Sequence, residues 1–69
     1  MDRAIESYQT AIRINPNYAD ARFNLGLALK QQNQKSAAID QFQKARSLYQ
    51  QQGDTKTVAD IDQLLQELS

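Results

Sequence analysis

The chain has 69 residues, with eight basic and eight acidic side chains and with neither cysteine nor histidine. Because so short a chain buries only about 60% of the surface that it exposes when unfolded, it forms one small domain, or a fragment, of marginal stability. The missing residue types exclude disulfides and thiolate metal sites and remove the commonest general base and metal ligand, and the zero net charge argues against general binding of nucleic acid or anionic membranes.

The first segment has the pattern of an amphipathic helix that ends near Asn15. Its apolar residues recur with a period near 3.6 and form one stripe. The pair Asn15-Pro16 stops the helix, because a proline disfavours helical backbone in the residue before it and lacks an N–H donor. The stripe consists of Ala4, Ile5, Tyr8, Ala11 and Ile12.

A second helix is predicted from about Ala19 to Gln32, with apolar residues on two of its sides. Two apolar sides imply two packing neighbours, or one neighbour and a ligand. The first side consists of Ala21, Leu25, Ala28 and Leu29, and the second of Phe23 and Leu27.

The polar stretch QNQKS predicts a short turn, with Asn33 as a C-cap and Ser36 as an N-cap. A turn this short makes the flanking helices antiparallel. The third helix is expected to run on to about Gln52, where Gly53 suits the left-handed position that ends many helices. Its apolar residues are Ala38, Ile39, Phe42, Ala45, Leu48 and Tyr49.

The last segment predicts a fourth helix, for which Asp54 or Thr55 can serve as the N-cap. Its apolar residues share one side, and its other faces carry Asp, Gln and Glu. Only one side therefore requires burial. The apolar residues are Val58, Ile61, Leu64, Leu65 and Leu68.

The first and third helices look like copies of one element. When the chain is shifted by 34 residues, residues 4–14 fall on residues 38–48, with four identities and three conservative pairs in eleven positions. A fixed period of this length indicates a repeat architecture. The identical pairs are Ala4/Ala38, Ile5/Ile39, Gln9/Gln43 and Ala11/Ala45.

The residues within this period resemble the tetratricopeptide repeat (TPR), whose pattern is W-x2-L-G-x2-Y, then A-x3-F, then P. The best-matching stretches are Leu25-Gly26 and Ala38-x3-Phe42, and Pro16 lies in the same frame. A glycine inside a helix costs about 1 kcal/mol relative to alanine, so Gly26 is expected where a neighbouring helix comes too close for a side chain. The departures from the pattern are Arg22 for the aromatic residue, Leu29 for the tyrosine and Gln50 for the proline.

This resemblance implies an all-α fold, an antiparallel helix-turn-helix α-solenoid of about four helices in one unit over residues 1–69. Residues 1–16 would be the second helix of a partial repeat, residues 19–52 one full repeat, and residues 54–68 a C-terminal capping helix. The last segment does not match a third repeat, and solenoids need a terminal helix with a polar outer face. We therefore expect the C-terminal fragment of an array.

The resemblance also implies a protein-interaction module or scaffold that binds a peptide or partner protein in a concave groove. Asn24 occupies the place where some family members hold a peptide's main chain or terminal carboxylate. Two alternatives to a role in binding stay open. In the first, Asn24 only caps a helix or faces solvent. In the second, Phe23 and Leu27 are buried against the first helix. The implied groove residues are Asn17, Asp20, Phe23, Asn24, Leu27, Lys30 and Gln31.

A second hypothesis is a ligand-free structural fragment that self-associates through its first helix. If that helix lacks its own antiparallel partner, a face with Ile5, Tyr8 and Ile12 lies partly uncovered. An exposed apolar patch of this kind usually marks a binding surface. The hypothesis predicts a homo-oligomer, whereas the first one fits part of a longer repeat array.

No cluster of side chains predicts an enzyme, a metal site or a cofactor. Asp60 and Asp62 point to different faces of a helix and so cannot bind one ion together. Ser36, Asp40 and Lys44 form a solvated ladder, a row of polar side chains that recur every four residues along one exposed side of their helix. No apolar run approaches the roughly 20 residues of a membrane span, and no charged-then-apolar leader opens the chain. We expect a soluble protein, cytoplasmic by default, without a membrane or nucleic-acid partner.

Overall fold

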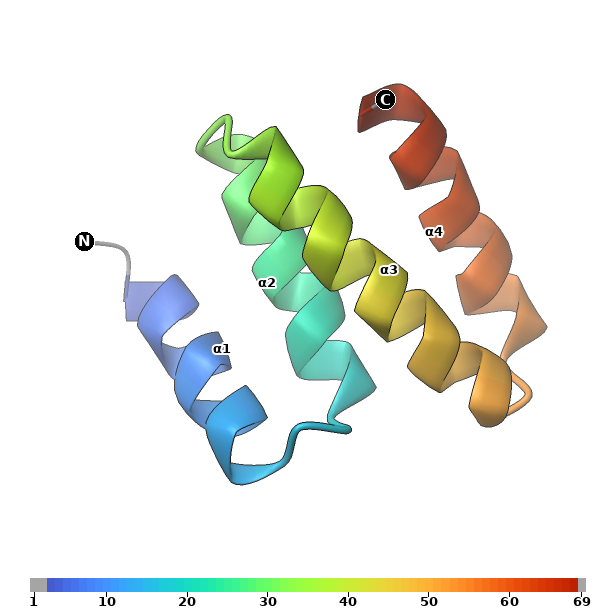
Figure 1. The fold of residues 1–69 in the computed structure, drawn as a ribbon, viewed down its shortest axis with the longest axis horizontal. Coiled ribbons are helices and arrows are strands. Elements are labelled where there is room, and N and C mark those ends of the chain that lie inside the picture. Colours follow the sequence, from blue (N-terminus) through green and yellow to red (C-terminus); the bar gives the residue numbers. More distant parts are fainter. Residues whose placement is uncertain (1–2, 69) are drawn as a thin grey trace.

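The computed structural model describes residues 3–68 and contains four helices and no strand within that range (Figure 1). The all-α prediction is therefore confirmed, and the helix bounds lie within a few residues of the expected ones. The helices are α1 (Arg3–Ile14), α2 (Ala19–Gln31), α3 (Lys35–Gln51) and α4 (Thr55–Leu68).

The four helices form an open row in which neighbours run antiparallel (Figure 1). Helix α1 packs on α2, α2 on α3, and α3 on α4, and within residues 3–68 no other pair of helices is in contact. The row is flat, because its Cα atoms extend 33 × 27 Å in two directions and only 14 Å in the third. Only α2 and α3 therefore have a helix on each of two sides.

The core is centred on α3, where Ala38, Phe42 and Ala45 are fully buried. A Cβ atom built on Gly26 of α2 would lie 2.7 Å from Cε1 of Phe42. Real Cβ atoms essentially never lie so close to another atom, so the glycine allows α2 to approach the Phe42 ring. The sequence-based expectation for Gly26 is confirmed by this contact.

The turns α2–α3 and α3–α4 have the same hydrogen-bonding pattern. Asn33 (φ 63°) and Gly53 (φ 78°) each occupy the left-handed position directly after the C-cap residue of the helix. The next residue in each turn, Gln34 or Asp54, donates its N–H to a carbonyl five residues back. This pattern is a Schellman motif. The predicted role of Gly53 is thus confirmed, whereas the C-cap of α2 is Gln32, and Asn33, predicted as the C-cap, is the left-handed residue after it.

The predicted N-cap at Ser36 is wrong. Helix α3 already begins at Lys35, after Gln34, and no side chain caps its N-terminus. The Schellman motif explains the difference, because it uses Gln34 to close α2 and leaves no room for a longer turn.

Helix α4 has the side-chain cap that α3 lacks. The Asp54 carboxylate accepts hydrogen bonds from the Thr57 N–H (3.1 Å) and the Thr57 hydroxyl (2.8 Å). These two hydrogen bonds favour the charged carboxylate and lower the pKa of Asp54 below its ordinary value. Of the two caps that the sequence allowed, Asp54 is the one used.

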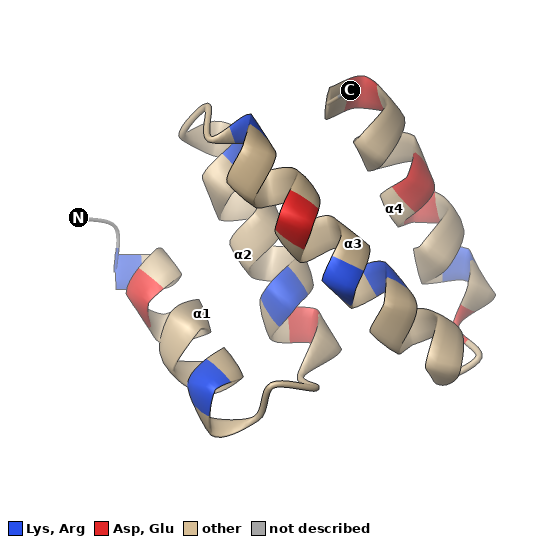
Figure 2. Cartoon of the chain, in the orientation of Figure 1, with Lys and Arg blue, Asp and Glu red and all other residues tan. Residues whose placement is uncertain are grey.

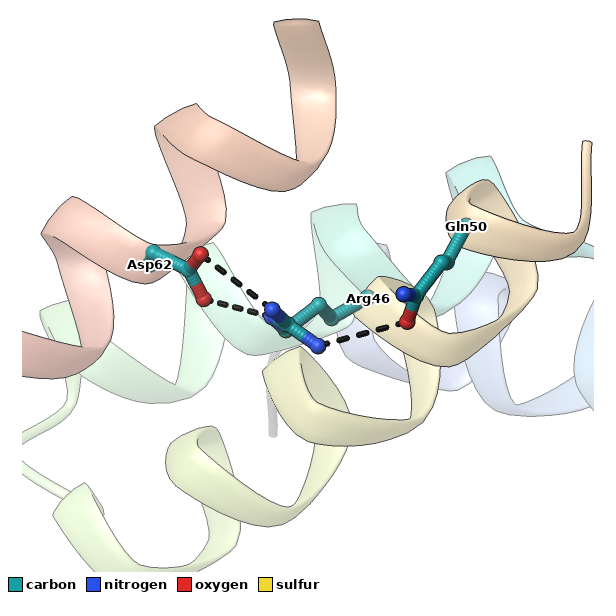
Figure 3. Close-up of polar contacts among 3 residues, drawn as sticks. All are labelled: Arg46, Gln50 and Asp62. Atoms are coloured by element: carbon teal, nitrogen blue, oxygen red, sulfur yellow. Dashed lines mark hydrogen bonds and ion pairs between the residues drawn. The ribbon is translucent and has the colours of Figure 1, made fainter. Parts of the chain in front are cut away.

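A polar contact joins α3 to α4 on their outer side (Figure 3). The Nε and Nη2 atoms of Arg46 lie 2.5 and 3.4 Å from the two carboxylate oxygens of Asp62. The Nη1 atom of Arg46 donates to the side-chain oxygen of Gln50, one turn along α3, at 3.4 Å. The contact is half-exposed, so it adds little stability.

Candidate functional site: the exposed face of helix α2

Helix α2 carries most of the residues that the resemblance placed in a binding groove. Phe23, Leu27 and Lys30 are half-buried, and Asn24 and Gln31 are exposed. Asp20 is also exposed, and Asn17 lies exposed in the turn before the helix. The set therefore forms a surface strip, with apolar side chains beside polar ones.

The ring of Phe23 is held by two aromatic rings of α3. Its centroid lies 5.8 Å from that of Phe42, with the planes inclined at 60°, and 6.5 Å from that of Tyr49, edge to face. Both geometries are favourable for aromatic pairs. The ring contacts of Phe23 are thus with α3, whereas the sequence-based alternative expected burial against α1. One side of the ring belongs to the core and the other remains at the surface.

Asp20 is engaged by Tyr49, a contact that the sequence did not predict. The buried Tyr49 hydroxyl at the end of α3 donates a hydrogen bond to the Asp20 carboxylate at the start of α2. Burial raises the pKa of the Tyr49 hydroxyl well above its ordinary value, and the bond to Asp20 raises it further. Tyr49 therefore stays neutral and fixes the Asp20 side chain at one end of the strip.

The charge of Asp54 also acts on the Tyr49 hydroxyl and raises its pKa. The helices α2 and α4 do not touch each other within residues 3–68, and both pack on α3.

Asn24 lies in the middle of α2 with its side chain exposed, so it does not cap a helix. Within the described part of the chain its amide makes no hydrogen bond to another residue. The amide offers one acceptor and two donor hydrogens, which match a peptide backbone. Of the sequence-based alternatives for Asn24, solvent exposure is what the structure shows.

Arg22 lies on a different side of α2 from the surface strip. Its Nε atom donates to the Pro16 carbonyl (2.9 Å) and its Nη1 atom to the Gln41 side chain (3.1 Å). The residue that replaces the usual aromatic of the repeat therefore ties the turn after α1 to α3. The sequence identified Arg22 as a departure from the repeat pattern but did not predict these partners, because they lie 6 and 19 residues away in the chain.

The face predicted for self-association, formed by Ile5, Tyr8 and Ile12, is partly covered. Ile5 is only 9% exposed, and Tyr8 and Ile12 are half-buried and pack against the core cluster. Within residues 3–68, α2 is the one helix in contact with α1. The exposed large apolar residue of α1 is Ile14, which is 78% exposed.

The described residues offer no assembled centre for metal chemistry. No group of three or more potential metal-binding side chains comes together within residues 3–68. Lys44 and Asp40 form an exposed ion pair of 3.2 Å, as expected for a solvated ladder. Over the same range, every helix is too short or too polar to cross a membrane.

Two family models match the chain. A model described as TPR repeat matches residues 1–33, and a model described as tetratricopeptide repeat matches residues 19–51. Comparison with curated proteins and with solved structures gave no significant match. Together with the antiparallel helices and the Gly26–Phe42 contact, these matches show that the chain belongs to the tetratricopeptide-repeat family. Repeats of this family generally mediate protein–protein interactions and are typically not catalytic.

Proposed function

We propose that the chain is a non-catalytic interaction module that binds an extended peptide, or an extended segment of a partner protein, along α2. The observation that carries this proposal is the strip of Phe23, Asn24 and Leu27. Two apolar side chains held by the core flank an exposed amide that makes no hydrogen bond within the described residues. The apolar pair would bind a partner's side chains, and the amide would bind its main chain.

Charges at the ends of the strip give it a direction. Asp20 lies at the start of α2, and Lys30 lies in its last turn. A bound peptide would gain most from a basic residue at the Asp20 end and an acidic group at the Lys30 end. Asn17 and Gln31 would form the polar rim at the two ends.

We also propose that α4 closes the repeat array. Its side remote from α3 carries exposed residues that are mostly polar or charged, and a hydrophobic neighbour would leave them without water. A terminal helix with a polar outer face is what a solenoid requires at its end. These residues are Lys56, Ala59, Asp60, Gln63 and Glu67.

The peptide-binding proposal is tested with random 12-residue peptides displayed on phage and selected on the immobilised chain. Selected peptides are synthesised and titrated against the wild type and against Asn24→Ala and Lys30→Ala. We expect Asn24→Ala to weaken binding about tenfold, the usual effect of losing a well-formed polar contact at a binding site. The control is Gln43→Ala, an exposed glutamine on α3. Equal binding to all four proteins would overturn the proposal.

A further inference from the structure

We propose that a second copy of this chain docks on an exposed surface of α1, as a two-fold symmetric, antiparallel α1–α1 pair. We call this surface the α1 face; it is a shallow hollow with Ile14 at one end. It lies on a different helix from the proposed peptide strip. The residues of the α1 face are Arg3, Glu6, Ser7, Thr10, Ala11 and Ile14.

Two residues of the α1 face have counterparts on α3 that are less exposed. Ala11 and Ile14 correspond to Ala45 and Leu48, 34 residues further along the chain. On α3, which packs on α2, Ala45 is fully buried and Leu48 is half-buried, whereas Asp40 and Lys44, the counterparts of Glu6 and Thr10, are exposed. On α1, Ala11 is half-buried and Ile14 is 78% exposed. A partner helix on this face would therefore remove Ile14 from water.

The small side chains of Ser7 and Ala11 allow two helices to approach closely. In an antiparallel pair with Ser7 of one copy opposite Ala11 of the other, the two-fold axis passes near residue 9 in each copy. In the same register, Ile14 of each copy lies opposite the helical turn that precedes Ser7 in the other copy. Each Ile14 would then enter the hollow of the opposite copy, where it is removed from water.

Charge complementarity selects the antiparallel arrangement. Helix α1 has basic residues near both ends and an acidic one between them (Figure 2). Glu6 and Arg13 are seven residues apart and so lie on the same side of the helix. Both are exposed, and neither has an ion pair within residues 3–68. In the register above, Glu6 of each copy is within reach of Arg13 of the other, which gives two equivalent ion pairs.

A head-to-tail arrangement of copies is less favourable. It would place the α1 face on the outer side of α4, where Lys56, Asp60 and Glu67 are exposed. Ile14 would then desolvate charged groups without pairing them. Head-to-tail contacts also propagate into filaments, whereas the two-fold pair closes as a dimer.

The first test measures self-association by sedimentation equilibrium from about 10 µM to about 1 mM. We expect a monomer–dimer equilibrium in the wild type, weakened more than about tenfold by Ile14→Asp. The control is Tyr18→Asp, which changes the other large exposed apolar residue, 47% exposed and outside α1. A wild type that is monomeric at every concentration would overturn the proposal, as would equal losses in the two variants.

The second test distinguishes this pair from any other occupant of the α1 face. Glu6→Arg alone brings two cations together at each contact, and Arg13→Glu alone brings two acids together, so each variant should dimerise roughly tenfold more weakly. Mixing the two variants restores an attractive pairing of opposite charges between the copies, so the mixture should dimerise better than either variant alone. If the mixture shows no gain, the face does not bind a second copy in this register. Circular dichroism confirms that each variant remains helical.

Discussion

Gly26 shows how a single residue sets the distance between two helices in this fold. Without a side chain, it lets the fully buried Phe42 ring rest on the backbone of α2. The same ring packs against Phe23 at the surface strip. The position of Phe23 in the candidate site therefore depends on the absence of a side chain at Gly26.

We predict that Gly26→Ala destabilises the chain although alanine is the better helix former. The new methyl group would lie under 3 Å from the Phe42 ring, and overpacking of this kind costs about 1–3 kcal/mol. The gain in helix propensity offsets at most about 1 kcal/mol of that. Thermal melts followed by circular dichroism should show a fall in Tm, with Asn24→Ala on the exposed side as the control. A Tm equal to or above that of the wild type would contradict the prediction.

Residue contacts divide into those that the sequence could predict and those that it could not. Gly26 could be predicted, because a glycine inside a helical pattern weakens the helix unless a close neighbour requires it. The bonds from Tyr49 to Asp20 and from Arg22 to Gln41 could not, because they join residues 29 and 19 positions apart. Polar side chains leave no periodic signal that would pair them across such distances.

At the level of elements, the helix ends decide where each helix points. Asn33 and Gly53 follow α2 and α3 with the same left-handed conformation, which the sequence indicated for Gly53 but not for Asn33. Ser36 has the chemistry of an N-cap but lies inside α3, because the tight turn before it ends at Gln34. A capping residue type is thus weaker evidence than the turn geometry that precedes it.

We predict that the cap of α4 contributes less stability at acidic pH. The folded-state pKa of Asp54 is below its unfolded value, so its contribution is full above the unfolded pKa of about 3.9. It is lost as the pH falls through the folded-state pKa. Asp54→Ala should lower Tm by a few degrees at pH 7, and the gap to the wild type should narrow steadily below about pH 4.

Asp60→Ala serves as the control for the cap, because Asp60 is an exposed carboxylate in the same helix, away from its N-terminus. Thermal melts of the three proteins from pH 7 to pH 2 provide the measurement. A gap between wild type and Asp54→Ala that stays constant or widens with acidification would show that the charged cap is not what stabilises α4.

The apolar stripe of α1 could be predicted, but the exposure of its residues could not. Within the stripe Ile5 is buried and Tyr8 and Ile12 are half-buried, whereas Ile14, outside the stripe, is the large apolar residue that stays exposed. Periodicity tells which side of a helix is apolar, and it does not tell how much of that side a neighbour covers.

At the scale of the whole molecule, the open row means that stability is a sum of nearest-neighbour interfaces. Helix α3 has two such interfaces and four buried residues, whereas α1 has one interface and buries only Ile5. Helix α4 also has one interface and buries only Ile61, but its N-terminus is capped by Asp54. A chain of this length has a total stability of roughly 3–10 kcal/mol. Helix α1 should therefore open locally, well before the rest of the chain unfolds.

We predict that native-state hydrogen exchange shows this gradient, with the amides of α1 exchanging fastest and those of α3 slowest among the four helices. Ile5→Ala should speed exchange in α1 and leave α3 and α4 nearly unchanged, because only the α1–α2 interface loses contacts. Phe42→Ala should lower protection everywhere, since a loss of about 3–5 kcal/mol approaches the total stability. The exchange is measured at the lowest practical protein concentration, where an α1–α1 pair would dissociate. Equal loss of protection in α1 and α4 on Ile5→Ala would mean that the row unfolds as one unit, with no separate opening of its first helix.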